Sequence, residues 1–118
     1  MEFNTIVKNI LLPLLSNRGF TVLNESKGRI VFSSNRFEVH CSYDFSRSKD
    51  FYLRVCNKIS SISSECLEDY ELIELLNFRR NSYQNLPEDE QIHKFASYYY
   101  DLFHEKGDLI FQSTLYMR

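Results

Sequence analysis

The segment from Phe37 to Phe45 alternates strictly between apolar and polar residues. Successive side chains of a β-strand point to opposite faces of the sheet, so this segment would present one apolar face and one polar face. The apolar set is Phe37, Val39, Cys41, Tyr43 and Phe45, and the polar set is Glu38, His40, Ser42 and Asp44. The pattern predicts a strand that packs on a core with one side and keeps the other side polar.

Three neighbouring segments have the same two-residue period. Residues 20–25 and 29–33 flank a short turn, and residues 51–56 follow a loop at residues 46–50. Short connections favour antiparallel neighbours, so we predict a four-strand antiparallel meander. Apolar residues must face apolar residues across the last hairpin, which requires paired residue numbers with an even sum. Tyr43 would then lie opposite Phe51 or Leu53.

The same register defines the polar side of that hairpin. We expect it to gather Glu38, His40, Ser42, Asp44, Tyr52, Arg54, Cys56 and Lys58. Any function carried by the sheet must use these side chains if no other element covers them. Four of them are our candidate binding residues: Glu38, His40, Tyr52 and Arg54.

Helical periodicity marks both ends of the chain. Apolar residues recur at helical spacing from Phe3 to Leu15, and Gly19 suits the left-handed residue that ends such a helix. Two more helices are expected over residues 70–80 and 87–106, the second ended by Gly107. The serine-rich segment 57–64 is expected to be an irregular connection. The chain therefore predicts one α+β domain over residues 1–118, with an N-terminal helix, the meander, and two helices packed on the sheet.

Several classes of function are disfavoured by the composition. Only 3 Gly are present, so no glycine-rich phosphate loop can be written and no nucleotide cofactor is expected. Neither the cysteines nor the histidines have metal-ligand spacing, so no metal is expected. A formal net charge of -2, with both signs mixed along the chain, disfavours a nucleic-acid partner.

The cysteines and the N-terminal segment indicate the cellular compartment of the protein. Cys41, Cys56 and Cys66 are an odd set, which argues against a disulfide framework. The apolar run ILLPLL is too short to span a bilayer and has no cleavage site after it, so we expect no membrane contact and a cytoplasmic location.

A catalytic constellation cannot be completed from the sequence. His40 and Cys41 point to opposite faces of a strand, whereas His40 and Cys56 share the polar face and are the better base and nucleophile pair. No orienting group or oxyanion donor can be added to them. A non-catalytic protein is the favoured interpretation, and a small enzyme that uses His40 and Cys56 is an alternative.

The run Tyr98-Tyr99-Tyr100 lies on the last predicted helix. One helix face cannot bury three consecutive aromatic residues, and Tyr99 matches the apolar stripe. Tyr98 and Tyr100 then either anchor a protein interface or pack at the edges of the stripe. We carry both as candidate binding residues.

The order of elements supports a resemblance. The helix that ends in LLPLLSNRGFTV, the hairpin FEVHCSYDFSRSKDFYLRVCNK and the two helices after it look like the layout of small bacterial α+β proteins, many of them uncharacterised and some of them immunity proteins. Immunity proteins bind and neutralise a cognate toxin, so the resemblance implies a protein partner. Self-association, or a small ligand or nucleic acid on the polar sheet face, are the alternatives.

Overall fold

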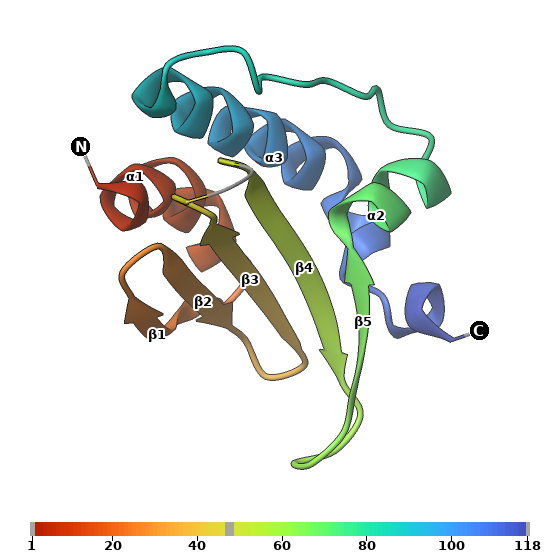
Figure 1. The fold of residues 1–118 in the computed structure, drawn as a ribbon. Coiled ribbons are helices and arrows are strands. Elements are labelled where there is room, and N and C mark those ends of the chain that lie inside the picture. Colours follow the sequence, from red (N-terminus) through yellow and green to blue (C-terminus); the bar gives the residue numbers. More distant parts are fainter. Residues whose placement is uncertain (1, 47–48, 118) are drawn as a thin grey trace.

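The fold was analysed in a computed structural model, which describes residues 2–46 and 49–117. Along the chain the elements are α1 (Phe3–Ser16), β1 (Thr21–Ser26), β2 (Arg29–Ser33), β3 (Phe37–Tyr43), β4 (Phe51–Lys58), β5 (Ser64–Glu68), α2 (Asp69–Leu75), α3 (Glu88–Ile110) and the 3-10 helix η1 (Ser113–Tyr116) (Figure 1).

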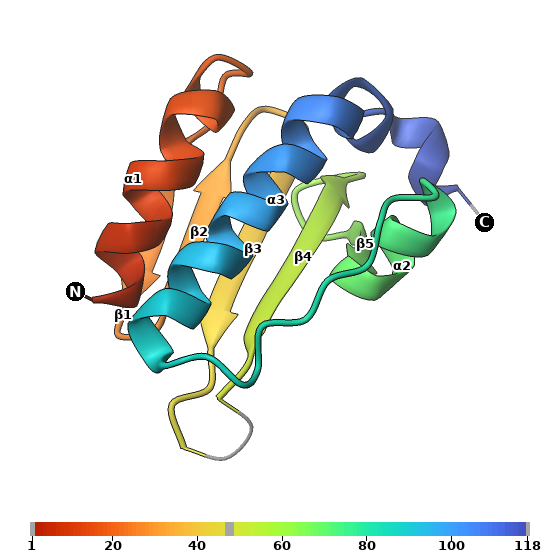
Figure 2. The same ribbon diagram turned by 90° about the horizontal axis from the view of Figure 1, so that it is seen from above.

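The five strands form one antiparallel sheet in sequential order. Helices α1 and α3 lie side by side across one face of this sheet, while α2 lies beside its β5 edge (Figure 2). The predicted α+β class with an antiparallel meander is therefore confirmed. We call the sheet face that α1 and α3 cover the inner face, and the opposite face the outer face.

The prediction of four strands was wrong, because β5 adds a fifth strand at the edge. β5 pairs with β4 over the whole of Ser64–Glu68, and Leu67 is its single fully buried apolar residue. An edge strand with one buried side chain has no alternating pattern that the sequence could reveal. The irregular connection is consequently shorter than expected and forms the turn between β4 and β5.

The register of β3 and β4 is one of the two that the predicted even-sum pairing allows. Tyr43 lies opposite Phe51, Cys41 opposite Leu53 and Val39 opposite Val55, so every apolar pair has an even sum. These inner-face side chains are buried and meet aromatic residues of the helices: Phe51 contacts the ring of Phe3 at 4.9 Å and that of Tyr99 at 5.1 Å between centroids. The core thus lies between the inner face and the α1–α3 layer.

Helix α1 ends as the sequence predicts. Gly19 has φ of +85°, and the amides of Gly19 and Phe20 donate to the carbonyls of Ser16 and Leu15, which is the hydrogen-bond pattern of a Schellman motif. Gly107, in contrast, does not end α3, which continues to Ile110. The Arg18 guanidinium lies where a Cβ of residue 107 would project, so glycine serves close packing there.

Helix α2 is shorter than predicted. It ends at Leu75, because Asn77 has φ of +53° and Phe78 turns back into the core. The predicted helix over residues 70–80 therefore includes two apolar residues, Leu76 and Phe78, that are buried from positions beyond the end of α2. None of the helices in the described ranges is long and apolar enough to cross a membrane.

Candidate functional site

The outer face of the sheet carries three cross-strand rows of mainly polar side chains. The first row runs Arg29, Ser42, Tyr52 across β2, β3 and β4, and the second runs Val31, His40, Arg54, Glu68 across β2 to β5. Three of the predicted binding residues, His40, Tyr52 and Arg54, therefore lie together. A third row adds Ser33, Glu38, Cys56 and Cys66.

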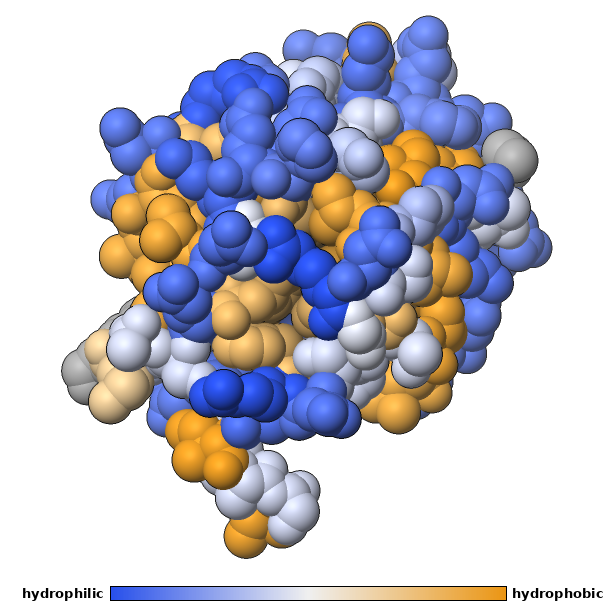
Figure 3. All heavy atoms as spheres, turned by 180° about the vertical axis from the view of Figure 1, so that it is seen from behind, coloured by the Kyte–Doolittle hydropathy of each residue, from blue (hydrophilic) through white to orange (hydrophobic). Residues whose placement is uncertain are grey.

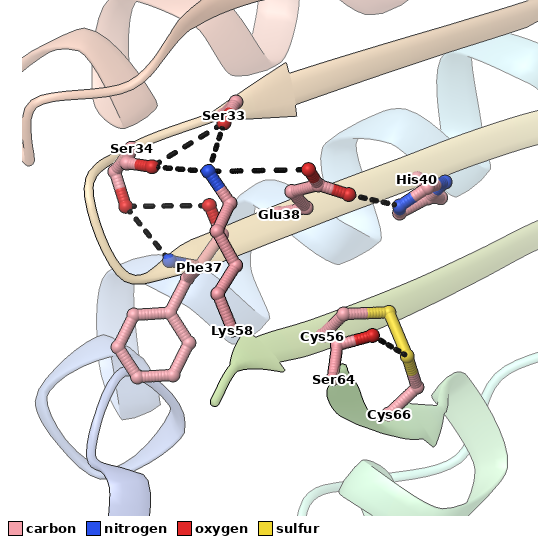
Figure 4. A network of polar contacts seen from close by, with 9 residues as sticks. All are labelled: Ser33, Ser34, Phe37, Glu38, His40, Cys56, Lys58, Ser64 and Cys66. Atoms are coloured by element: carbon pink, nitrogen blue, oxygen red, sulfur yellow. Dashed lines mark hydrogen bonds and ion pairs between the residues drawn. A yellow bond between two sulfur atoms is a disulfide. The ribbon is translucent and has the colours of Figure 1, made fainter. Parts of the chain in front are cut away.

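A polar network connects the third row to the second (Figure 4). The Nε2 atom of His40 lies 2.9 Å from Oε1 of Glu38, and Lys58 Nζ lies 3.9 Å from the other carboxylate oxygen. Lys58 also donates to Ser33 Oγ and to the Ser34 carbonyl, each at 2.6 Å. The Glu38 carboxylate is thus shared between an imidazole and an ammonium group.

His40 is held in a defined state by its surroundings. Because a carboxylate only accepts hydrogen bonds, Nε2 carries the hydrogen and Nδ1 is left with a lone pair. Nδ1 is buried and has no hydrogen-bond partner within the described part of the chain. Burial lowers the pKa of His40, the Glu38 bond opposes that effect, and the charges of Arg54 and Arg29 lower the pKa further. The neutral imidazole is therefore favoured.

Arg29 and Arg54 are both exposed, and neither forms an ion pair with any residue in the described ranges. Glu68, which is directly opposite Arg54, instead forms a capping box with Glu71 at the start of α2. The two arginines border a depression of about 390 Å³ on the outer face, which Ser42 and Tyr52 also line. This depression is a concave, polar site on the sheet.

Cys56 and Cys66 form a disulfide between β4 and β5, although the odd number of cysteines had argued against a disulfide framework (Figure 4). The two residues are direct partners in the β4–β5 register, which the sequence could not reveal without β5. Cys41 is buried and has a free thiol. Cys56 lies opposite Glu38 rather than His40, and its disulfide sulfur cannot act as a nucleophile.

The tyrosines of α3 mainly belong to the core. Tyr98 is 4% exposed and donates its hydroxyl hydrogen to the Arg79 carbonyl, so it is not a surface anchor. Tyr99 is buried and donates to Asp69 Oδ2 at 2.7 Å. Tyr100 is half-buried and stacks on the His104 ring. The structure therefore places Tyr98 and Tyr100 away from the outer face.

Two residues of the site were not predicted from the sequence. Arg29 joins the site through the β2–β3 register, and Glu68 through β5. The short turn at Ser34-Asn35 was the available signal for Arg29, since it fixes which residues of the two strands are opposite. No turn or periodic pattern in the sequence predicted the position of Glu68.

The turn between β4 and β5 projects from the body of the protein, and hydrophobic atoms reach its tip (Figure 3). Ile62 is 95% exposed and Ile59 is 58% exposed. The serines between and beside them are exposed as well. This projection adjoins the outer face at the Lys58 end of β4.

Within the described residues, no cluster of three or more His, Cys, Asp or Glu side chains has a geometry that could hold a metal ion. Comparison of the chain with protein-family models, with curated proteins and with solved structures finds no match.

Proposed function

We propose that this chain is a non-catalytic protein-binding protein of the bacterial cytoplasm, which covers part of a partner's surface with the outer face of its sheet. The observation that carries the proposal is the one-sided packing of the sheet. Helices α1 and α3 cover the inner face, and the outer face is left with polar side chains that are only partly buried. We therefore propose the outer face of the sheet, rather than the tyrosines of α3, as the binding surface.

The composition of the outer face fits a protein interface. Arginine and tyrosine are the residue types that most often anchor such interfaces, and the face offers Arg29, Arg54 and Tyr52, the last of which is 45% exposed. Glu38 already holds His40 through a hydrogen bond and Lys58 through an ion pair. A partner would meet side chains that have lost part of their freedom before binding, which lowers the entropic cost.

The immunity type is the most specific form of this proposal. Immunity proteins act by covering a toxin and need no catalytic group of their own. Both charge signs are interspersed on the outer face, and complementary charges of that kind favour fast and selective association. The order of one helix, the meander and two helices also supports the immunity type, but only through its resemblance to small bacterial α+β proteins.

A small ligand on the same face is a second candidate, because the depression beside Arg29 and Arg54 is concave. Nucleic acid is supported less well. A strand of phosphates needs a continuous basic track, whereas Glu38 and Glu68 lie among the basic residues Arg29, Arg54 and Lys58 of the outer face.

Co-expression tests the proposed function. The product of the adjacent gene in the source genome should arrest growth when expressed alone, and this chain should restore growth and co-purify with that product in a defined stoichiometry. Restored growth without a stable complex, or a complex that leaves the arrest unchanged, would contradict the immunity type. A homogeneous self-dimer that buries the outer face would contradict binding to a different protein.

A further inference from the structure

We infer that Arg29 and Arg54 form a carboxylate-binding subsite on the outer face, which takes one aspartate or glutamate side chain of the protein partner. The class of partner rests on the proposed function. The chemistry of the subsite rests on the register, the charges and the hydrogen bonds described above.

The two arginines approach the middle of β3 from opposite sides. Arg29 on β2 is opposite Ser42, and Arg54 on β4 is opposite His40. Neighbouring strands are about 4.8 Å apart, so the backbones of β2 and β4 are about 10 Å apart across β3. Arginine side chains are long enough to bridge much of that gap over the outer face. An acceptor above β3 can therefore meet both guanidinium groups.

The guanidinium groups have donors to offer because the nearby carboxylates are engaged elsewhere. Glu38 is bound to His40 and Lys58, and Glu68 is part of the α2 capping box. A guanidinium has five N–H donors in a planar fork that matches a carboxylate. The hydroxyl group of Ser42, which lines the depression, adds a further hydrogen-bond donor.

The charge of the depression favours a single negative charge. Its charged lining consists of two guanidinium groups and the Glu68 carboxylate, which leaves a net charge of +1 while His40 is neutral. One carboxylate compensates that charge, whereas a phosphate dianion would exceed it. Asp and Glu are the side-chain carboxylates of proteins, so the subsite fits an acidic side chain of the partner.

His40 provides an internal reporter of occupancy. The groups that face it are Arg29 from β2, Glu38 from β3, Arg54 from β4 and, in the same row, Glu68 from β5. Positive charge from the two arginines is one of the causes that lower its pKa. A bound carboxylate offsets this charge, so the pKa of His40 should rise on binding.

Nuclear magnetic resonance titration of the full chain tests the subsite. The probe is a blocked pentapeptide with one glutamate among glycines and serines, and its controls are the same peptide with glutamine and inorganic phosphate. The glutamate peptide should give saturable shifts confined to β2, β3 and β4 and should raise the pKa of His40. Arg29→Gln and Arg54→Gln should each weaken this binding about fivefold or more. Lys94→Gln, which removes one positive charge from the exposed side of α3, should leave it unchanged.

Equal shifts with the glutamine peptide, tighter binding of phosphate, or equal loss in Lys94→Gln would overturn the inference. The titration also separates the subsite from the proposed function. If the peptide binds as expected but no protein partner exists, the function fails and the subsite stands. If a partner complex forms that Arg29→Gln and Arg54→Gln leave unaffected, the subsite fails and the function stands.

Discussion

His40 and Arg54 are direct neighbours across β3 and β4, and both side chains lie on the outer face. Burial is the largest cause of the lowered pKa of His40, and the charge of Arg54 acts in the same direction. The hydrogen bond to Glu38 acts in the opposite direction but does not restore the ordinary value. The folded protein consequently binds a proton at His40 less readily than the unfolded chain does.

This relationship predicts a loss of stability in mild acid. Neutral His40 contributes to the unfolding free energy, and this contribution is fully present above the ordinary histidine pKa of 6.5. It declines as the pH falls below 6.5 towards the lower pKa of the folded state, because the unfolded chain then binds a proton that the folded protein does not. Urea unfolding between about pH 8 and about pH 5 should show this decline in the wild type. His40→Gln should show a shallower decline, and identical pH profiles would contradict the prediction.

The disulfide should stabilise the sheet edge. Cys56 and Cys66 are 10 residues apart, and opening a loop of that size is expected to cost about 2–3 kcal/mol of unfolding free energy. The double variant Cys56→Ala/Cys66→Ala should lose that amount in urea unfolding. A reducing agent should destabilise the wild type similarly and leave the double variant unchanged. Equal sensitivity of both proteins to the reducing agent would contradict this account.

The proposed cytoplasmic location makes a different prediction for the same pair. Cytoplasmic thiols are kept reduced, so rapid alkylation of living cells followed by mass spectrometry should find Cys56 and Cys66 mainly as thiols. Purification in air should then produce the disulfide. A fully oxidised pair in cells would place the protein in an oxidising compartment, and it would leave the proposed binding surface untouched.

Gly28 should resist substitution for two separable reasons. Its φ of +73° disfavours any other residue, and an added Cβ would lie 2.5 Å from the Phe45 ring. Gly28→Ala should therefore lower the unfolding free energy by about 1–2 kcal/mol. Gly19→Ala is the matched control, since Gly19 has φ of +85° with no atom near the added Cβ. Gly28→Ala should cost more than Gly19→Ala, and Phe45→Ala should remove the difference. If that difference persists without the Phe45 ring, the steric part of this explanation is wrong.

The sequence was sufficient for the parts of the fold that depend on strong periodicity. The alternation from Phe37 to Phe45 and from Phe51 to Val55 predicted even-sum pairing between β3 and β4, and this parity placed His40 and Arg54 on one face. β5 was not predictable because a strand with one buried residue has no visible period. The disulfide and the position of Glu68 depend on β5, so both were missed for the same reason.

The end of α3 and the burial of Tyr98 could not be predicted, because they depend on tertiary contacts that a sequence pattern does not contain. Gly107 lies inside α3, where its missing side chain leaves room for the Arg18 guanidinium from a segment distant in sequence. Tyr98 is buried because the loop after α2 returns over α3 and supplies the Arg79 carbonyl as an acceptor. In both cases the deciding neighbour lies outside the periodic segment.

The most direct test of the outer face as the binding surface compares the affinities of two charge-reversal variants for the purified partner. Arg54→Glu changes the centre of the outer face, and Lys94→Glu makes the same change in charge on exposed α3, beyond the inner face. Isothermal titration calorimetry should show at least about tenfold weaker binding for Arg54→Glu and a change within about twofold for Lys94→Glu. Equal effects of the two reversals, or a larger effect of Lys94→Glu, would contradict the assignment of binding to the outer face.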